Sequence, residues 1–202
     1  MVKLLFAGSL ILLVAGCRGE AGGAKVSFVE TRVDESQSPL PFVIALANSG
    51  GAATDVDGIS IEVLGGIVLP GSKAPAGRDD LEVIATDACR VDMLAGHPTE
   101  IPARGDGVAC GFVTWERSKE APAAVAVVSA RFRVTLADGA TVETPPRALL
   151  LPSKAGVVGS TIEELTLDRD EAAKLLARVE ALPGERTENF DRLVEKLRAL
   201  AK

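Results

Sequence analysis

The 202-residue sequence contains few of the side chains that enzymes and sugar-binding proteins most often use. It has no tyrosine, one tryptophan and one histidine, and it contains no GxSxG, HExxH or P-loop motif. A catalytic site is hard to assemble without histidine partners or a marked carboxylate pair, so we expect no enzymatic activity and no cofactor. The shortage of aromatic rings argues against a carbohydrate-binding platform and favours Trp115 as a core residue.

The sequence also lacks a basic cluster of the kind that binds nucleic acid. Its 22 lysines and arginines are scattered among 28 acidic residues, which gives a net charge of −6. Removal of an N-terminal leader containing Lys3 would leave 21 basic against 28 acidic residues, a net charge of −7. Binding to nucleic acid depends on clustered cations that release counterions, so we expect no nucleic-acid partner.

Two short motifs are better explained as turns than as sites. His97 lies between Gly96 and Pro98 without fellow ligands, which indicates a loop residue. The tripeptide Arg104-Gly105-Asp106 matches the one that animal integrins recognise, but glycine and aspartate suit a turn in any case.

Residues 1–16 have the layout of a signal peptide. A single cation, Lys3, precedes an apolar run at residues 4–14, and small residues stand directly before Cys17. The run is shorter than the roughly 20 residues that a permanent transmembrane helix needs. We therefore expect a cleaved leader.

The segment Val14-Ala15-Gly16-Cys17 resembles the lipobox of bacterial lipoproteins. The resemblance implies that the Cys17 thiol is lipidated, that residues 1–16 are removed, and that lipid chains anchor the protein to a membrane of the cell envelope. The alternative is an unmodified cysteine in a signal peptide that is cut elsewhere. Because Arg18 is not aspartate, the resemblance further implies sorting to the outer membrane, facing the periplasm, in a Gram-negative host. Residues 17–24 would then form a flexible tether with a reach of about 15 Å.

Assigning Cys17 to lipid leaves Cys89 and Cys110 as a pair. Both lie in runs that alternate like strands, Cys89-Val91-Met93 and Val108-Cys110-Phe112. A hairpin-like pairing would place the two thiols opposite each other, so we predict a disulfide in this exported chain. A metal pair and a redox couple are the alternatives, but the chain has no CxxC motif and no second ligand cluster.

Residues 25–152 show short apolar stretches separated by turn signals, without a convincing helical period. The clearest alternation runs from Ala126 to Leu136, with Arg131, Arg133 and Thr135 on the opposite face, and Asp138-Gly139 then marks a hairpin. About seven or eight strands at this spacing predict a mainly β domain, an antiparallel sandwich.

The stretch ALANSGGAATDVDGISIEV resembles immunoglobulin-like modules of bacterial surface proteins, in which an Asn-Ser-Gly turn joins two core strands. That resemblance implies an immunoglobulin-like sandwich. The chain departs from true immunoglobulin domains because Trp115 follows both Cys89 and Cys110 and does not lie between them. Only the architecture is therefore implied.

Residues 160–202 have a helical pattern. Asp168 and Glu171 form a capping-box pair, Pro183-Gly184 interrupts the pattern, and a second helix is expected to begin near Thr187. We predict a C-terminal α-helical hairpin. Its apolar stripes would pack on each other or on the sandwich, or would dock a protein partner.

These features favour a non-enzymatic, membrane-anchored envelope lipoprotein that presents a protein-interaction or assembly surface. The alternative is a small-ligand or cation-binding lipoprotein. Asp55 and Asp57 are weak candidates for a metal site because Asp55-Val56-Asp57-Gly58 is similar to the opening of a calcium loop. The following residues do not continue that motif, which favours a surface turn.

Overall fold

The computed structural model describes residues 22–70, 89–94, 100–115 and 123–202. The predicted signal peptide, Cys17 and His97 lie outside these residues. The described part is mainly β, as the sequence predicts. Its strands are β1 (Val26–Val33), β2 (Leu40–Asn48), β3 (Thr54–Pro70), β4 (Cys89–Met93), β5 (Glu100–Ile101), β6 (Gly105–Trp115), β7 (Ala124–Leu136), β8 (Thr141–Glu143), β9 (Arg147–Pro152) and β10 (Glu185–Arg186). The helices are α1 (Val157–Glu164), α2 (Arg169–Glu180) and α3 (Glu188–Leu200).

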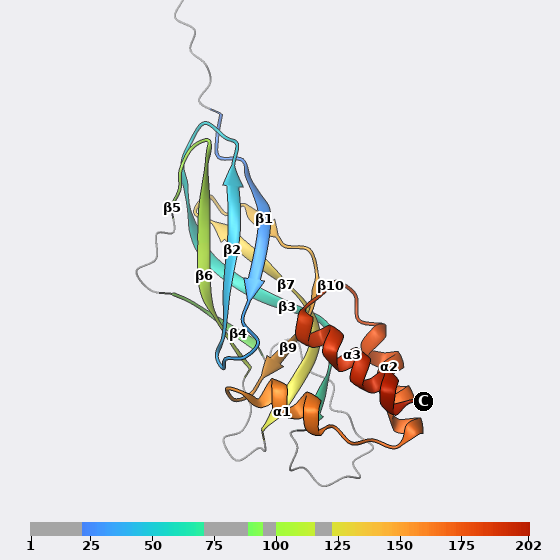
Figure 1. Ribbon diagram of the computed structural model, residues 1–202. Coiled ribbons are helices and arrows are strands. Elements are labelled where there is room, and N and C mark those ends of the chain that lie inside the picture. The colour runs from blue at the N-terminus through green and yellow to red at the C-terminus, as the bar shows by residue number, and fades with distance from the viewer. Residues whose placement is uncertain (1–21, 71–88, 95–99, 116–122) are drawn as a thin grey trace, which may run out of the picture.

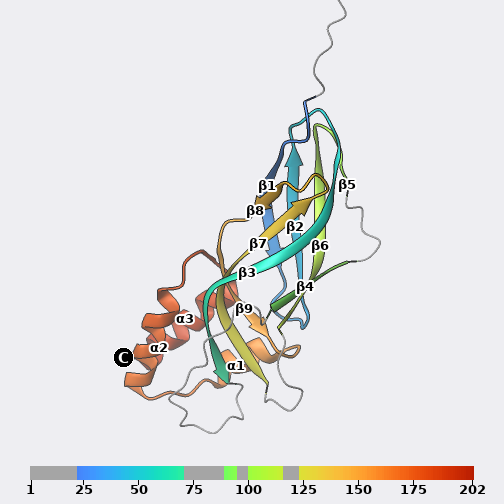
Figure 2. The same ribbon diagram turned by 180° about the vertical axis from the view of Figure 1, so that it is seen from behind.

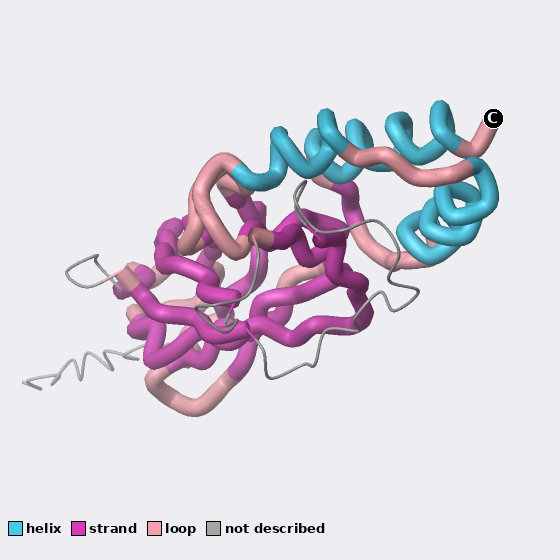
Figure 3. The backbone as a smooth tube through the Cα atoms, turned by 90° about the horizontal axis from the view of Figure 1, so that it is seen from below, coloured by secondary structure: helices cyan, strands magenta, loops and turns pink. Residues whose placement is uncertain are grey.

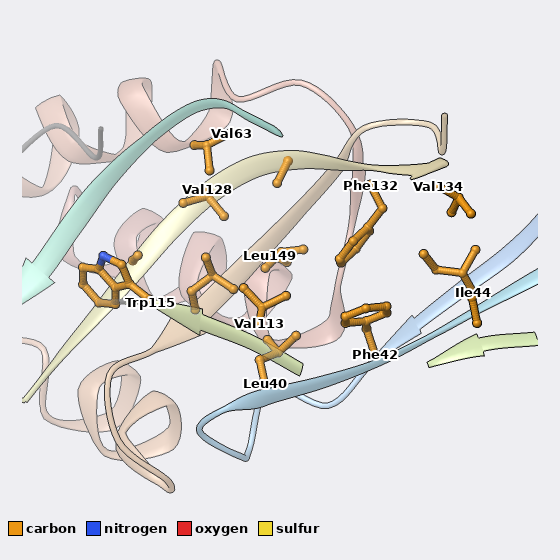
Figure 4. Packing of buried hydrophobic residues seen from close by; sticks show 14 of the residues in the cluster. Leu40, Phe42, Ile44, Val63, Val113, Trp115, Val128, Phe132, Val134 and Leu149 are labelled. Carbon is orange, nitrogen blue, oxygen red and sulfur yellow. The ribbon is translucent and has the colours of Figure 1, made fainter. Parts of the chain in front are cut away.

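The strands form two sheets that face each other across one apolar core. We call this pair of sheets the sandwich. The first sheet has the order β1-β2-β6-β4, and the second has the order β10-β9-β7-β3-β5, with β8 paired to β7. Side chains from both sheets meet between them (Figure 4), where the rings of Phe42 and Phe132 lie 4.7 Å apart. Trp115 belongs to this core, as predicted.

Strand β3 contains two consecutive glycines, which in a sequence often indicate the end of a strand. It continues through Gly65 and Gly66 as one bent strand (Figure 2). Its register against β7 shifts between Val63 and Gly65, which marks a bulge with Leu64 as the extra residue. The bulge changes which residues face the sandwich core, so Val68 faces that core while Ile67 and Leu69 face the helices.

Strand β7 is apolar on both faces along its first half because two layers cover it. Ala126 and Val128 point into the sandwich, whereas Val125 and Val127 pack against the helices. Figure 3 shows the helices lying along one side of the strands. The second half of β7 extends beyond the helices, and there Arg131 is only partly buried on the outer face. This agrees with the predicted alternation.

The predicted helix starts are confirmed. Asp168 and Glu171 form a reciprocal capping box at the start of α2, and the Thr187 side chain accepts the Phe190 N–H at the start of α3. The sequence predicted two helices within residues 160–202, and it identified neither α1 as a separate helix nor the two-residue strand β10, which pairs in parallel with β9. No described helix has the length and hydropathy to cross a membrane.

The described chain begins at the end of the sandwich farthest from the helices (Figures 1 and 2). Gly22 accepts the Gly51 N–H through its carbonyl oxygen, and the Lys25 N–H donates to the side chain of Asn48. A Cβ on Gly50 would collide with the backbone of residues 23–25, so glycine permits this close approach. Residues 22–25 are therefore held against the turn that follows β2.

Candidate interaction surface

The two central strands of the first sheet carry apolar residues on their outer face as well as on their core face. In β2 and β6 these outer residues form three cross-strand pairs, Pro41 with Phe112, Val43 with Cys110 and Ala45 with Val108. None of them belongs to the sandwich core or to the cluster beneath the helices. We call these six residues, together with Leu94, the outer apolar face.

Exposed hydrophobic side chains concentrate on and beside this face. Among the described residues, the large hydrophobic side chains that are exposed are Val29 (57%), Val43 (40%), Leu64 (40%), Leu94 (39%) and Val108 (41%). Val29, Val43 and Val108 belong to the first sheet. Leu94 directly follows β4, and its N–H donates to the Cys110 carbonyl of β6. Exposed apolar residues that gather on one surface commonly mark an interaction site.

Ion pairs border the outer apolar face on both edge strands. On β1, Arg32 Nε donates to Glu30 Oε1 at 2.9 Å, and on β4, Arg90 pairs with Asp92 at 3.1 Å. The Arg32 guanidinium holds the pKa of Glu30 below its usual value. An apolar centre with a charged rim is the usual composition of a protein–protein interface.

The outer face of the second sheet is different because it is already occupied. The helices cover one half of it, and an ion network covers much of the other half. In this network Arg131 pairs with Glu62 and Glu143 at 2.8 Å, and Arg133 pairs with Glu143 at 2.8 Å. The outer apolar face is therefore the stronger candidate for a partner.

This surface was not identified from the sequence. The alternation Val108-Cys110-Phe112 predicted a strand without deciding which of its faces is buried, and the core-facing residues are Gly107, Ala109, Gly111, Val113 and Trp115. Gly107 and Gly111 lack side chains where those of Ile101 and Phe42 fill the space above them. A one-residue shift in phase turns every side chain of a strand to the other face.

The positions of the two cysteines in β4 and β6 explain why the structure lacks the predicted disulfide. Cys89 is paired with Trp115 on the core side of the first sheet, while Cys110 points outward five residues away along β6 (115 minus 110). At about 3.4 Å per residue the separation is about 17 Å, far beyond the roughly 7 Å that a disulfide tolerates between Cα atoms. Both cysteines are free thiols, which corrects the prediction.

The weak metal candidates lie on a strand and not in a loop. Asp55 and Asp57 are exposed near the start of β3, where Asp55 pairs with Glu100 of β5. An extended strand does not wrap its carboxylates around one cation, unlike the calcium loop considered from the sequence. Within the described residues no group of three or more His, Cys, Asp or Glu is placed to hold a metal ion.

Arg104 occupies the turn before β6 with φ of 52°, and Gly105 and Asp106 begin that strand. The Arg104 N–H donates to the Gly50 carbonyl at 3.1 Å, so the backbone here joins the turn after β2. A structural role for this tripeptide agrees with its interpretation from the sequence.

The apolar stripes of the C-terminal helices are used in packing. Phe190, Leu193, Val194 and Leu197 of α3, and Leu175 and Val179 of α2, are buried with residues of β3, β7 and β9. Of the two roles considered for these stripes, the structure shows packing on the sandwich. A partner surface on α2 or α3 would have to use their charged outer residues.

A small cavity lies between β1 and the start of β9. Its volume is about 30 Å³, and it is lined by Phe28, Thr31, Phe132, Thr144, Pro145, Arg147 and Glu185. The Thr31 hydroxyl, on a residue that is 4% exposed, has no protein partner. This volume suits one or two water molecules and excludes an organic ligand.

Comparison with known proteins provides little information about this surface. No protein family matches the chain, and no curated protein matches it. A solved structure that matches, the X-ray structure of Northeast Structural Genomics Consortium target SoR45, shares 14% sequence identity with it. The match covers 74% of this chain and 93% of that one with a TM-score of 0.23, which carries no argument about fold or function.

Proposed function

We propose that this protein is a non-enzymatic lipoprotein of the bacterial envelope whose outer apolar face binds a protein partner. The gathering of exposed Val43, Val108 and Leu94 between two charged edges carries the proposal. Residues 1–16 would be the signal peptide, and lipids on Cys17 would be the membrane anchor, as the lipobox resemblance implies.

The position of Gly22 supports a defined orientation on the membrane. Four residues, 18–21, separate Cys17 from Gly22, and five extended steps of about 3.5 Å span at most about 18 Å. The tip of the sandwich would therefore lie beside the membrane, with the helices pointing away from it (Figure 1). The strands of the first sheet would run outward from the bilayer, and their apolar face would stand accessible from the side.

The order of the strands supports the immunoglobulin-like part of the proposal. With β1, β2, β6 and β4 in one sheet and β3, β7 and β9 in the other, the order corresponds to the ABED and CFG sheets of a constant-type immunoglobulin domain. Strands β5, β8 and β10 are additions to that pattern. Contact between α2 and α3 supports the proposed helical hairpin at the C-terminus.

Site-specific photo-crosslinking in intact envelopes tests the interaction surface. A photoreactive residue at Val43 or Val108 should give one discrete crosslinked species, because both side chains lie on the outer apolar face. Ala173, exposed on α2, is the matched control position and should give none. Equal products at all three positions, or none at any, would contradict the proposed surface.

The anchor is tested separately. Cys17→Ser should abolish incorporation of radiolabelled palmitate and leave the leader uncut, because the serine hydroxyl cannot form the thioether. Continued labelling of this variant would contradict the lipoprotein assignment without bearing on the surface.

A further inference from the structure

The turn between β1 and β2 carries a buried carboxylate. Glu35 is 5% exposed, although it lies in a connection between two strands. Its neighbour Asp34 shapes the turn, because Asp34 Oδ1 accepts both the N–H of Ser36 at 3.0 Å and the Ser36 hydroxyl at 2.6 Å. The turn is therefore ordered, and it directs Glu35 into the protein.

Glu35 provides the hydrogen-bond acceptor that the edge of β9 lacks. Strand β10 pairs with β9 only as far as Ala148, whose carbonyl accepts the Thr187 N–H at 3.1 Å. The next N–H on that edge, from Leu150, donates to Glu35 Oε1 at 2.6 Å. The carboxylate thus takes the place of a strand where β10 ends.

The same oxygen of Glu35 also holds the start of α3. The Thr187 hydroxyl donates to Glu35 Oε1 at 2.7 Å, and the Thr187 Oγ1 accepts the Phe190 N–H at 3.3 Å. A chain of two hydrogen bonds therefore runs from a first-turn N–H, which has no acceptor within the helix, through the threonine hydroxyl to the carboxylate. We call the contacts of Glu35 with Leu150 and Thr187 the Glu35 bridge.

The turn reaches α1 as well, since the Ser36 carbonyl accepts the Gly156 N–H at 3.0 Å. The segment that connects two strands of the first sheet thus touches β9 and the starts of α1 and α3. The Glu35 bridge therefore joins the sandwich to the helical layer.

Several charged groups lie on the elements that the bridge joins. Arg147 of β9 interacts electrostatically with Glu35, and it forms an ion pair with Glu185 at 2.9 Å. On the side of α3, Arg186 pairs with Asp191 at 3.9 Å, and Lys154 precedes α1. Within the turn, Asp34 is engaged by Ser36 and Gln37.

Burial has the largest effect on the carboxyl group and raises the pKa of Glu35. The hydrogen bonds from Leu150, Thr187 and Asn189 lower this pKa, and so does the charge of Arg147, but the net direction is upward. A neutral carboxyl group still offers its carbonyl oxygen to both donors, whereas the ionised form must be kept away from water at a cost in free energy.

We propose that Glu35 is a pH-dependent link that fastens the C-terminal helices to the sandwich when it is neutral and loosens them when its proton passes to solvent. The stability that it contributes is full below the ordinary glutamate pKa of 4.5. That contribution is lost as the pH rises through the higher pKa of the folded state.

Amide hydrogen exchange on the full mature chain tests the proposal between pH 4 and pH 8, with rates corrected for the intrinsic effect of pH. Protection of Leu150 and of the first turns of α3 should fall by about tenfold or more as the pH rises. Protection of Ile44 in β2 should change much less. Glu35→Gln imitates the neutral acid and should keep the acidic level of protection at every pH.

Glu30→Gln is the matched control, since it removes an exposed carboxylate from β1, the strand that precedes the turn of Glu35, and it should follow the wild type. The proposal is overturned if Glu35→Gln shows the wild-type pH profile, or if protection falls equally in β2 and α3. Thr187→Val supplies a second test, because it removes one donor and should lower α3 protection at acidic pH. Unchanged protection in that variant would also overturn the link.

Discussion

The side-chain oxygen of Asn48 accepts the backbone N–H of Lys25 at 3.0 Å and ties the start of the described chain to the end of β2. The same oxygen accepts the Gly50 N–H at 2.9 Å, and the amide nitrogen donates to Ala52 and Pro102 at 2.8 and 3.2 Å. Asn48 is 2% exposed. One buried amide therefore joins three backbone segments at the tip of the sandwich.

We predict that Asn48→Ala lowers the free energy of unfolding by about 2–4 kcal/mol, since it removes a buried amide and leaves its buried and part-buried backbone partners without a hydrogen bond. Urea unfolding of the two proteins measures the difference. Ser27→Ala, which removes an exposed hydroxyl from the neighbouring strand, is the control and should change stability by less than about 0.5 kcal/mol. A loss in Asn48→Ala no larger than in this control would refute the assigned role.

Two glycine substitutions should shift stability in opposite directions. A Cβ at Gly111 would lie 2.5 Å from the Asp92 carbonyl oxygen and 2.8 Å from Phe42 Cζ. Gly111→Ala should therefore destabilise the protein by about 1–3 kcal/mol through overpacking. A Cβ at Gly159 in α1 meets nothing within 4 Å, and Gly159→Ala should stabilise the protein by about 0.5–1 kcal/mol. Thermal unfolding of both variants checks the signs, and loss of stability in both would contradict this packing.

Both described cysteines should be present as thiols with unequal reactivity. Burial raises the pKa of Cys89 to about 11, and it also raises the pKa of Cys110. Cys89 packs against the core, while Cys110 lies on the outer apolar face, so alkylation at pH 8 should modify Cys110 first. Peptide mass analysis without reductant measures both sites. A peptide that joins Cys89 to Cys110 would contradict the strand register.

Glu62 should have a pH dependence opposite to that of Glu35. Its hydrogen bond with Arg131 holds the pKa of Glu62 below the ordinary value of 4.5. The stability that Glu62 contributes is therefore present above pH 4.5 and is lost as the pH falls through the lower pKa of the folded state. Glu62→Gln should flatten the acidic side of the stability curve, measured by urea unfolding at several pH values. Glu164→Gln, at an exposed position in α1, should leave the curve unchanged, and a change equal to that of Glu62→Gln would rule out the assignment.

Local features of the structure were predictable because neighbouring residues in the sequence determine them. The capping pair Asp168 and Glu171 and the cap Thr187 act within one helical turn, and Gly139 supplies the positive φ of 82° that the hairpin turn requires. The pattern of β7 identified Arg131 as an outward residue for the same reason. In the second half of β7, apolar residues alternate with arginine or threonine, so the sequence alone distinguishes the two faces.

Contacts between distant strands were less predictable, and β6 shows why. Both faces of this strand carry apolar residues, so alternation alone does not say which face is buried. The bulky residues Val108 and Phe112 lie on the outer face, while the core side is partly glycine because Phe42 and Ile101 occupy its space. The predicted pairing of Cys89 with Cys110 assumed that the two thiols lie opposite each other, but they lie on different faces of the sheet.

Glu35 illustrates the same limit on the function of a single residue. In the sequence it is one acidic residue within the polar run that precedes β2. Only the folded chain brings it to Leu150 and Thr187, which are 115 and 152 residues away.

By itself the sequence determined the mainly β character of the chain, its turns and its helix starts, because these depend on propensities and contacts within a few residues. Only the tertiary structure decided which faces of β2 and β6 are exposed, where the thiols lie and what Glu35 contacts. These properties depend on which surfaces can fill one another's volume and satisfy one another's hydrogen bonds. That complementarity exists only when distant segments have come together.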